Sequence, residues 1–398
     1  MKVIQLYNIQ RSGGGGESRV VNSTQELLTR YGHAAKVFTR DSQTVTTFTH
    51  RVKAAFKGVY SWEARRAVGD ILRREHPDVV HVHNLYPLFS PSVLTACKEY
   101  GTAVVMTVHN YGLMCPVQNH LCHGVVCERC THGREYLCLL HDCKNDLCES
   151  AAYALRNIIA RKKRWFHDGV SRFIAVSEYV RDRLCSAGIP DEQVVTIHNS
   201  VPIPDRPANP MYGKYVGFVG RVSAEKGIEC LLDSAARLPT IEVSIAGDGP
   251  EMPALLGMAP NNVSFVGWLQ GQQISSWYQN ARFIVVPSVW WEPCSLVVLE
   301  AMSYGLPVIA SKLGGLPELV EHGLNGFLVE PGNVDELARR IAHLWDSPDL
   351  CQIMGRASRK KAIQRHSEEL YYEKLVATYE AAIESSHGDK MRARGEEL

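Results

Sequence analysis

Short apolar runs rich in β-branched residues alternate with longer amphipathic segments along the whole chain. This alternation is typical of βαβ units, in which helices cover both faces of a parallel sheet. A proline-rich segment at residues 201–210, VPIPDRPANP, separates two complete series of such units. The expected strands of the first series are Val3–Ile9, Ala35–Thr39, Asp78–Val82, Ala103–Val108, Phe173–Val176 and Val194–Ile197, and those of the second are Tyr215–Val219, Ile241–Ala246, Val263–Val266, Phe283–Val286, Pro307–Ala310 and Gly326–Val329.

The pattern predicts an α/β protein made of two doubly wound, Rossmann-like domains. A chain of 398 residues is long enough for both, because single cores stop growing at about 250–300 residues. We place the domains at residues 1–203 and 204–367, and we expect residues 368–398 to form a C-terminal helix that returns to the N-terminal domain, followed by a charged tail. Ligands of doubly wound sheets bind beyond the carboxyl ends of the strands, so we expect the two domains to face each other across a functional cleft.

The composition is that of a soluble globular protein. Hydrophobic residues make up 45% of the chain and charged residues 21%. No run of about 20 apolar residues is present, and the chain begins with a strand-like segment rather than a leader. We therefore expect a cytoplasmic protein, with peripheral attachment to the inner face of a membrane as an open alternative.

Charge is divided between the two halves of the chain. Residues 1–202 contain 25 Lys and Arg against 18 Asp and Glu, whereas the remaining residues contain 18 against 24. The positive half suits an anionic partner, but nucleic acid is not expected because no recognition module accompanies the charge. Residues 156–166 hold five cations and two aromatic residues without an acid, which fits either an anionic membrane surface or the solvated face of a helix.

The segment Arg282–Gly305, RFIVVPSVWWEPCSLVVLEAMSYG, predicts a buried strand, a loop and then a helix. Pro293 suits the first turn of that helix, so Glu292 would lie at the helix entrance and Glu300 two turns further along. Free backbone N–H groups in such a turn form an anion site that suits a diphosphate. The residues that would supply these groups are Ser295, Leu296 and Val297. The alternative is a surface acid followed by an ordinary amphipathic helix.

A second motif, Gly217–Gly227, includes the first strand of the second series and the turn after it. Arg221 and Lys226 would lie at a strand-to-helix turn, where two cations can neutralise a leaving diphosphate. The chain contains no Asp-x-Asp, so we do not expect a bound divalent ion in this role. The alternative is a pair of solvated loop charges. A glycine run at residues 13–16 follows the first strand of the chain and would let the backbone approach a ligand closely.

Together these motifs resemble the retaining glycosyltransferases of family 4, which have the two-domain GT-B fold. The resemblance covers nearly the whole chain. Besides the motifs above it includes residues 78–83 (DVVHVH), 107–110 (TVHN), 175–177 (AVS) with Asp182, 246–250 (AGDGP), 314–318 (GGLPE) and 325–326 (NG). Two positions depart from the family, which usually has Phe-Gly in place of Cys294-Ser295 and Asn-Gly in place of Asn199-Ser200.

The resemblance implies a role for each matched residue. Arg221 and Lys226 would hold the donor diphosphate, Glu300 the ribose, Glu292 and His109 the donor sugar, and Asp248 and Gly249 the surroundings of the nucleobase, while Gly15 and Gly16 would also contact the donor. The catalytic residues would be His109, Arg221, Lys226 and Glu292. For His109 the alternative is a histidine satisfied by hydrogen bonds at the end of a strand.

The family also implies an activity, which is the transfer of a hexosyl group from a nucleotide sugar to a glycan, a lipid-linked or another surface-glycoconjugate acceptor. Such a reaction belongs to polysaccharide biosynthesis. Because the family offers no agreed carboxylate nucleophile, we expect a front-face displacement without a metal or other catalytic cofactor. The alternatives on the same fold are a nucleotide-sugar hydrolase or epimerase, a phosphorylase, and a binding protein without turnover.

Seven of the twelve cysteines lie between residues 115 and 148, which we interpret as an insertion in the N-terminal domain. Cys127 and Cys130 have the spacing of metal ligands, and two further thiolates would complete a structural zinc site. The preferred set is Cys115, Cys127, Cys130 and Cys143. The alternatives are an iron–sulfur cluster, which the spacing of Cys122, Cys127 and Cys130 also resembles, and a group of reduced thiols or disulfides.

Overall fold

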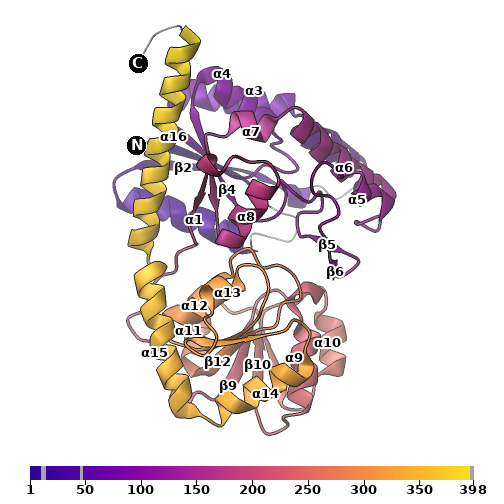
Figure 1. Cartoon of the computed structure of the whole chain (residues 1–398), viewed down its shortest axis with the longest axis vertical. Helices are drawn as coiled ribbons and strands as arrows, with labels where there is room; N and C mark the ends of the chain where they lie inside the picture. The colour runs from indigo at the N-terminus through magenta and orange to yellow at the C-terminus, as the bar shows by residue number, and fades with distance from the viewer. Residues whose placement is uncertain (10–14, 45–47, 395–398) are drawn as a thin grey trace. The chain divides into compact units, whose positions relative to one another are not determined.

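The computed structural model of the chain describes residues 1–9, 15–44 and 48–394 (Figure 1). The chain forms two compact α/β units. The N-terminal unit comprises residues 1–123, residues 127–198 and the segment from Tyr371 onwards, and the C-terminal unit comprises residues 124–126 and 199–370. The first two glycines of the predicted glycine run, at residues 13 and 14, lie outside the described residues, whereas Gly15 and Gly16 open the first helix.

The N-terminal unit is built on a parallel six-stranded sheet with the order β2-β1-β3-β4-β7-β8. Its strands are β1 (Lys2–Ile9), β2 (Ala34–Asp41), β3 (Val79–Asn84), β4 (Ala103–Val108), β7 (Arg172–Ala175) and β8 (Val194–Thr196). Its larger helices are α1 (Gly15–Arg30), α2 (Phe48–Val59), α3 (Trp62–Glu75), α4 (Ser92–Tyr100), α6 (Leu147–Lys162), α7 (Trp165–Gly169) and α8 (Glu178–Ser186). The strand order reverses between β1 and β3, which makes their carboxyl ends the place for a ligand.

Polar side chains set the start of several of these helices. Ser61, Asp146 and Ser177 precede α3, α6 and α8, and each side chain accepts a hydrogen bond from the backbone N–H three residues later. A cap of this kind stabilises a helix by about 1 kcal/mol, because it satisfies a donor that has no partner inside the helix.

The long C-terminal helix α16 (Glu368–Arg394) packs on the sheet of the N-terminal unit. Its buried side chains lie three or four positions apart, at Tyr371, Leu375, Tyr379 and Ala382. They join a hydrophobic cluster that contains Val3 of β1 and Val79 of β3. The helix also contributes polar contacts, since the hydroxyl of Tyr379 lies 2.7 Å from Nδ1 of His81.

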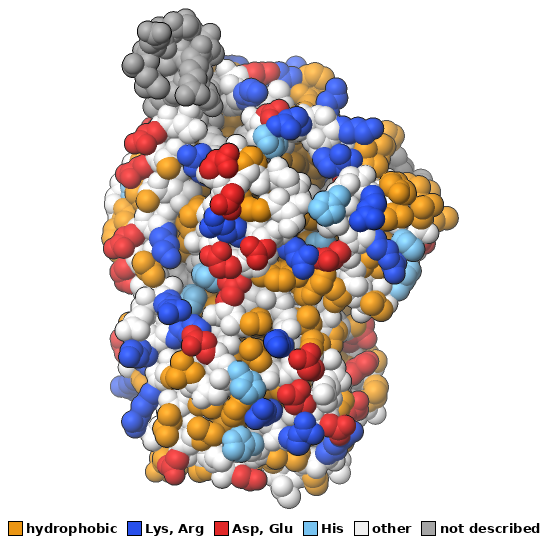
Figure 2. All heavy atoms as spheres, viewed as in Figure 1, with side chains coloured by type: hydrophobic (Ala, Val, Ile, Leu, Met, Phe, Trp, Pro, Cys, Tyr) orange, Lys and Arg blue, Asp and Glu red, His pale blue; other side chains and the backbone are white. Residues whose placement is uncertain are grey.

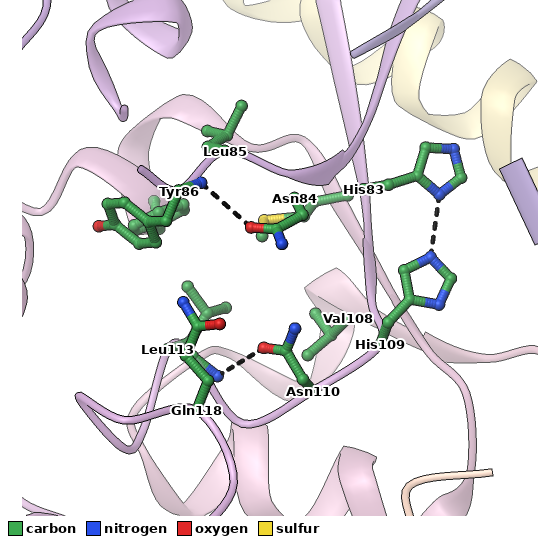
Figure 3. Close-up of a pocket in the computed structure, with 12 residues that line it drawn as sticks. His83, Asn84, Leu85, Tyr86, Val108, His109, Asn110, Leu113 and Gln118 are labelled. Atoms are coloured by element: carbon green, nitrogen blue, oxygen red, sulfur yellow. Dashed lines mark hydrogen bonds between the residues drawn. The ribbon is translucent and has the colours of Figure 1, made fainter. Parts of the chain in front are cut away.

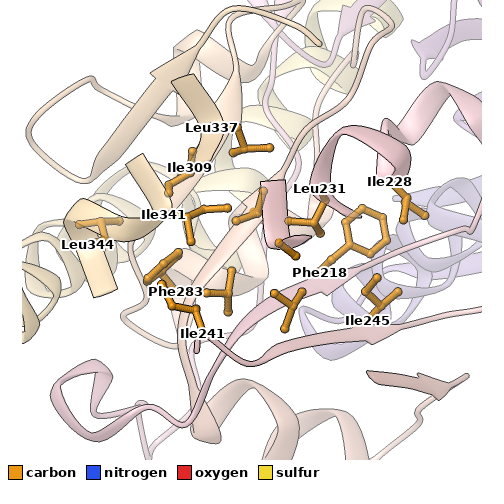
Figure 4. Close-up of a cluster of buried hydrophobic side chains, with 14 of the residues drawn as sticks. Phe218, Ile228, Leu231, Ile241, Ile245, Phe283, Ile309, Leu337, Ile341 and Leu344 are labelled. Carbon is orange, nitrogen blue, oxygen red and sulfur yellow. The ribbon is translucent and has the colours of Figure 1, made fainter. Parts of the chain in front are cut away.

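The C-terminal unit repeats the same plan with a parallel sheet in the order β11-β10-β9-β12-β13-β14. Its strands are β9 (Tyr215–Val219), β10 (Val243–Ala246), β11 (Val263–Gly267), β12 (Ala281–Val286), β13 (Val308–Ser311) and β14 (Gly326–Val329). Its helices include α9 (Ile228–Ala236), α10 (Met252–Met258), α11 (Gln272–Asn280), α12 (Leu296–Ser303), α13 (Leu316–Leu319), α14 (Val334–Trp345) and α15 (Pro348–Arg365). Figure 4 shows one of its hydrophobic cores, in which strand residues Phe218, Ile245, Phe283 and Ile309 pack with helix residues Leu231, Leu337, Ile341 and Leu344.

The structure confirms all twelve predicted strands, with ends that differ by at most two residues. It also confirms the α/β class with two doubly wound sheets. Residues 115–148 contain little regular structure beyond two two-residue strands, β5 (Leu121–Cys122) and β6 (Val125–Val126), the short helix α5 (Leu137–Leu140) and the first turn of α6. No described helix is long and apolar enough to cross a bilayer.

Candidate functional site

The candidate site of the C-terminal unit lies where the strand order reverses, between β9 and β12. Arg221 and Lys226 come from the loop after β9, and Ser288 and Glu292 come from the loop after β12. The two motifs that the sequence analysis selected separately therefore meet at one edge of one sheet.

Lys226 and Glu292 form an ion pair, with Nζ and Oε1 only 2.6 Å apart. Oε1 of Glu292 also accepts a hydrogen bond of 2.8 Å from the Ser288 hydroxyl. Glu292 is 5% exposed, and a carboxylate buried to this degree needs a nearby charge or several donors. Nζ of Lys226 also lies 5.2 Å from the centre of the Trp290 ring. The sequence predicts Lys226 at the diphosphate and Glu292 at the sugar, but it shows neither their contact nor the role of Ser288.

Two glycines allow this close approach of loops. Gly227 has φ +67°, and a Cβ at this position would lie 2.0 Å from the carbonyl oxygen of Pro287. Gly314 has φ +58°, and its Cβ would lie 2.5 Å from the carbonyl oxygen of Glu292. Any other residue would push the loop after β9, or the loop after β13, away from the end of β12.

Asp248 and Gly249 follow β10 and lie against the loop after β9. The backbone N–H of Val222 donates to the carbonyl oxygen of Asp248 at 2.9 Å. The backbones are so close that a Cβ on Gly249 would lie 2.2 Å from the carbonyl oxygen of Val222. The Asp248 side chain is exposed, and its Oδ1 accepts from the N–H of Gly249 at 2.7 Å. These residues are thus part of the same sheet edge as Arg221, which is also exposed.

Helix α12 begins at Leu296, and Ser295 is its N-cap. The Ser295 hydroxyl accepts a hydrogen bond from the N–H of Val298. The prediction that Pro293 occupies the first turn is wrong, because the serine cap starts the helix three residues later and leaves Pro293 in the loop. The N-terminus of α12 still presents the N–H groups of Leu296 and Val297, which have no acceptor four residues back in the helix.

Glu300 lies in the second turn of α12, and its Oε2 accepts a hydrogen bond of 2.7 Å from the Tyr278 hydroxyl. Tyr278 comes from α11 and is buried. The sequence does not predict this tyrosine, because nothing in the spacing of α11 connects it to the glutamate motif.

The two departures from the family pattern lie against each other. Cys294 forms hydrogen bonds with Asn199, the residue at the other departure. Burial raises the pKa of the Cys294 thiol to about 12, although the hydrogen bonds from Asn199 oppose the shift. Cys294 is therefore a neutral packing residue and not a nucleophile at neutral pH.

In the N-terminal unit, His109 follows β4 and belongs to a chain of buried hydrogen bonds (Figure 3). Its Nε2 lies 2.9 Å from Nδ1 of His83, and Nε2 of His83 lies 2.7 Å from Oε1 of Gln5. The amide of Gln5 is oriented by its own nitrogen, which donates to the carbonyl oxygen of Val21 at 3.4 Å. Its oxygen therefore faces His83 and accepts a hydrogen bond from Nε2–H of that ring.

This chain fixes the protonation of both imidazoles. Burial lowers the pKa of His109 to about 4 and the pKa of His83 well below its ordinary value, so both rings are neutral at pH 7. Because His83 donates from Nε2 to Gln5, its Nδ1 accepts a hydrogen bond from Nε2–H of His109. The acceptor nitrogen of His109 is then Nδ1. His109 is thus hydrogen bonded at a strand end, as the alternative interpretation expected, and it also lines a pocket.

That pocket is shown in Figure 3 and is lined by residues that follow β3 and β4, among them His83, Asn84, Tyr86, His109, Asn110 and Gln118. Asn84 and Tyr86 are 5% and 6% exposed. Within the described residues, Nδ2 of Asn84 and the hydroxyl of Tyr86 have no hydrogen-bond partner. Buried polar atoms without partners are rare, and the pocket beside these two has room for one or two water molecules that could supply partners. The side chain of Asn110 is held by Glu17 of α1, whose Oε1 accepts from Nδ2 at 2.8 Å.

The basic stretch at residues 156–166 is less exposed than its sequence indicates. Arg156 is buried, donates to the carbonyl oxygen of Pro116 at 2.9 Å and stacks on Tyr86, so its assignment to a membrane surface is wrong. Arg161 forms an ion pair with the buried Glu135, and Arg164 forms one with Asp168. Lys162 and Lys163 are exposed. Arg156 is buried because one face of α6 packs on the rest of the N-terminal unit.

The four predicted zinc ligands belong to the N-terminal unit. Cys115 and Cys130 are buried, and Cys127 and Cys143 are partly buried. Across the part of the chain that the structure describes, no three metal-binding side chains already surround a common point.

Comparisons with known proteins agree with the fold. Residues 13–203 match Glycosyltransferase Family 4, and residues 213–347 match Glycosyl transferases group 1. Sulfoquinovosyl transferase SQD2 of Arabidopsis thaliana is 36% identical over 149 residues, which is 36% of this chain and 29% of that protein. The chain spans less than two thirds of the length of the first curated relatives that it matches.

Solved structures are similar over almost the whole chain. Sucrose-phosphate synthase from Thermosynechococcus elongatus has a TM-score of 0.71 at 18% identity and covers 96% of this chain and 98% of its own. Anabaena Alr3699/HepE, solved in complex with UDP, has a TM-score of 0.65 at 19% identity and covers 96% of this chain and 100% of its own. With both halves of the chain matched in order, the protein belongs to the family 4-like glycosyltransferases of the GT-B fold.

Proposed function

We propose that the protein transfers a sugar from a nucleotide-sugar donor to the hydroxyl group of a glycan or lipid-linked acceptor. The observation that carries this proposal is the cluster of Lys226, Glu292 and Ser288 beside Arg221 at the switch point of the C-terminal sheet. Such an edge suits a diphosphate, because it combines two cations with the N-terminus of α12. The match to families of glycosyltransferases and the UDP complex of Anabaena Alr3699/HepE support this choice of donor class.

The ion pair orients Lys226 for this role. Glu292 engages one of the three N–H donors of the ammonium group, and the others remain to contact phosphate oxygens. Arg221 would bind the same diphosphate from the other end of its loop. Glu300, already held by Tyr278, would accept hydrogen bonds from the ribose hydroxyls.

The surroundings of Glu292 favour displacement without a covalent intermediate. Its Oε1 already accepts hydrogen bonds from Lys226 and Ser288, which weakens it as a nucleophile. We infer that the bond from the anomeric carbon to the diphosphate breaks while the acceptor oxygen bonds to the same face of that carbon. The hydroxyl proton passes to the departing phosphate oxygen. This route retains the configuration, and Lys226, Arg221 and the α12 N-terminus stabilise the leaving charge without a metal ion.

The pocket beside His109 has room for a hydroxyl group or a water molecule rather than for a whole sugar. Nδ2 of Asn84 and the hydroxyl of Tyr86 would each gain a partner from a sugar hydroxyl. Nδ1 of the neutral His109 would accept a hydroxyl proton in a hydrogen bond. The pocket is neutral, so it would discriminate by hydroxyl geometry rather than by charge.

We further propose that the acceptor is presented at an anionic membrane. Figure 2 shows hydrophobic side chains near the edge where Figure 1 labels α5 and α6, with Lys and Arg beside them. The exposed apolar residues there are Leu139, Leu140, Leu147 and Leu155. Together with the exposed Lys162 and Lys163, they form a surface that combines apolar contact with positive charge, as peripheral proteins do.

The experiment that tests the activity uses the whole chain with UDP-, GDP- and ADP-sugars, each with and without lipid-linked and soluble glycan acceptors. We expect one donor class to yield a glycoside only when acceptor is present, with the anomeric configuration of the donor. Release of free sugar at the same rate with or without acceptor would instead indicate a hydrolase. Tight donor binding without any product would indicate a binding protein.

A further inference from the structure

Trp290 lies in the loop after β12, between two residues that are fixed to the loop after β9. On one side of it, the N–H of Val289 donates to the carbonyl oxygen of Glu225 at 3.0 Å. On the other side, Oε1 of Glu292 accepts a hydrogen bond from Nζ of Lys226 at 2.6 Å. The backbone that carries the Trp290 ring is therefore held on both sides against the loop that carries Lys226.

The Trp290 ring contacts the ammonium group of Lys226. Nζ lies 5.2 Å from the ring centre, within the distance at which the negative face of an aromatic ring attracts a cation. The Lys226 side chain is only 24% exposed, so water weakens this attraction less than it would at an open surface. Among aromatic side chains, tryptophan attracts a cation most strongly. The ammonium group thus has two partners, the carboxylate of Glu292 and the ring of Trp290.

The indole N–H of Trp290 makes no comparable contact. Nε1 is buried, and within the described residues it has no hydrogen-bond partner. A buried donor without an acceptor costs free energy, so the N–H does not hold the ring in place. The contribution of this residue is therefore the face of its ring.

We propose that Trp290 is a positioning residue for sugar transfer and that it acts through Lys226. This inference rests on the proposed function, in which Lys226 binds the donor diphosphate. A lysine has a long flexible stem and loses rotamer freedom when its ammonium group is fixed. The ring and the Glu292 carboxylate restrict that group before the donor binds, so less freedom is lost when charge develops on the departing phosphate oxygen. The effect of Trp290 on the rate therefore depends on Lys226.

The test compares two substitutions of Trp290 in the full chain, with a soluble acceptor. Trp290→Leu removes the aromatic face, and we expect kcat/KM for the donor to fall about 5–30-fold, as when a partly buried cation–π contact is lost. Trp290→Phe keeps an aromatic face, so kcat/KM should stay within about threefold of the wild type. Because Trp290→Phe also removes the N–H that has no partner, its melting temperature should be equal to or higher than that of the wild type.

Trp62→Leu is the matched control. The guanidinium carbon of Arg65 lies at the same distance, 5.2 Å, from the centre of the exposed Trp62 ring, in the N-terminal unit. This substitution also removes a cation–π contact, but away from the proposed diphosphate site, and it should leave kcat/KM unchanged.

A double-mutant cycle separates positioning of Lys226 from simple support of the loop. In the Lys226→Ala background, Trp290→Leu should lower kcat/KM less than about twofold, because the group that the ring positions is absent. A ring that only supports the packing of the loop would cause the same loss in both backgrounds, and that result would overturn the proposal. Equal kcat/KM of Trp290→Leu and the wild type would also overturn it, as would a Trp290→Phe variant that loses as much as Trp290→Leu.

NMR of the lysine side chains tests the contact without any donor. The ring current of Trp290 should shift the methylene protons next to Nζ of Lys226 in the wild type, and this shift should disappear in Trp290→Leu. An identical spectrum for the two proteins would show that the ring does not hold Lys226. If the wild type transfers no sugar from any donor, the proposed function fails, whereas this shift still decides whether Trp290 restrains Lys226.

Discussion

The two units place different chemistry at the same point of the same topology. Both contain a parallel, doubly wound, six-stranded sheet, and both carry their candidate residues at the carboxyl ends of the strands. In the C-terminal unit these residues are charged, with Lys226 paired to Glu292. In the N-terminal unit they are neutral, because burial lowers the pKa of both His83 and His109. The topology thus places the candidate residues at corresponding positions in the two units, and the side chains make one position charged and the other neutral.

The largest expected effect comes from the charged site. Lys226→Ala removes a cation from the proposed leaving group and leaves the buried Glu292 without its cationic partner. We expect turnover to fall by about 10²–10³-fold, as when one donor is lost from an oxyanion site. The measurement is kcat/KM for the donor, with circular dichroism to show that the fold is kept. The matched control is Lys312→Ala, at an exposed lysine outside the cluster, which should leave kcat/KM unchanged. Equal activity of Lys226→Ala and wild type would remove the diphosphate assignment.

At the neutral site, the quantity expected to change is the pH dependence of the free energy of unfolding. The pKa of His109 is about 4 in the folded protein and about 6.5 in an unfolded chain, so the unfolded state binds protons more readily below pH 6.5. The free energy of unfolding is therefore not reduced by this histidine above about pH 6.5. As the pH falls towards 4, protonation of the unfolded chain lowers it by about 3 kcal/mol. Urea unfolding of the wild type and of His109→Asn at several pH values measures it. Identical pH slopes for the two proteins would contradict the assigned protonation state.

Ser288→Ala tests the support of the charged site. It removes the hydroxyl that donates to Glu292 but keeps the ion pair with Lys226. Loss of one hydrogen bond to a buried charged group should lower the free energy of unfolding by about 1.5–3 kcal/mol. Turnover should fall less than in Lys226→Ala. Ser303→Ala, whose hydroxyl bonds to a backbone carbonyl in α12, is the comparison variant and should leave turnover unchanged.

The smallest effect concerns the membrane surface. Each exposed lysine near anionic lipid contributes about 1 kcal/mol, so Lys162→Ala with Lys163→Ala should weaken binding to vesicles rich in anionic lipid by roughly 30-fold. Co-sedimentation with anionic and with neutral vesicles measures this change. Arg181→Ala, in α8, is the control. Its guanidinium is paired with Asp191, so its loss should change vesicle binding little. If the double variant binds anionic vesicles as well as the wild type, the proposed surface is wrong.

The sequence predicts the sheets well, because every buried strand is a short β-branched run that helices separate. It also places Arg221, Lys226 and Glu292 near strand ends. It cannot show that Lys226 and Glu292 touch, since they are 66 positions apart and meet only because β9 and β12 are neighbours. Nor can the sequence show the hydrogen bond between Tyr278 of α11 and Glu300 of α12.

The sequence also does not predict which individual polar residues are buried. Arg156 reads as one more cation in a basic stretch, yet the packing of α6 turns it inward onto Tyr86. Pro293 reads as a first-turn proline, but the Ser295 cap decides where α12 starts. The link from Gln5 through His83 to His109 joins three strands, and a single sequence carries no signal for such a pairing.

The most direct test of the central claim is the configuration of the product formed from the preferred nucleotide sugar, followed by NMR from the first turnovers. We predict a glycoside with the same anomeric configuration as the donor, formed in the presence of a chelator of divalent metal ions. We also predict that Lys226→Ala makes the same product about 10²–10³ times more slowly. An inverted product, or a reaction that stops until magnesium or manganese is added, would contradict that claim.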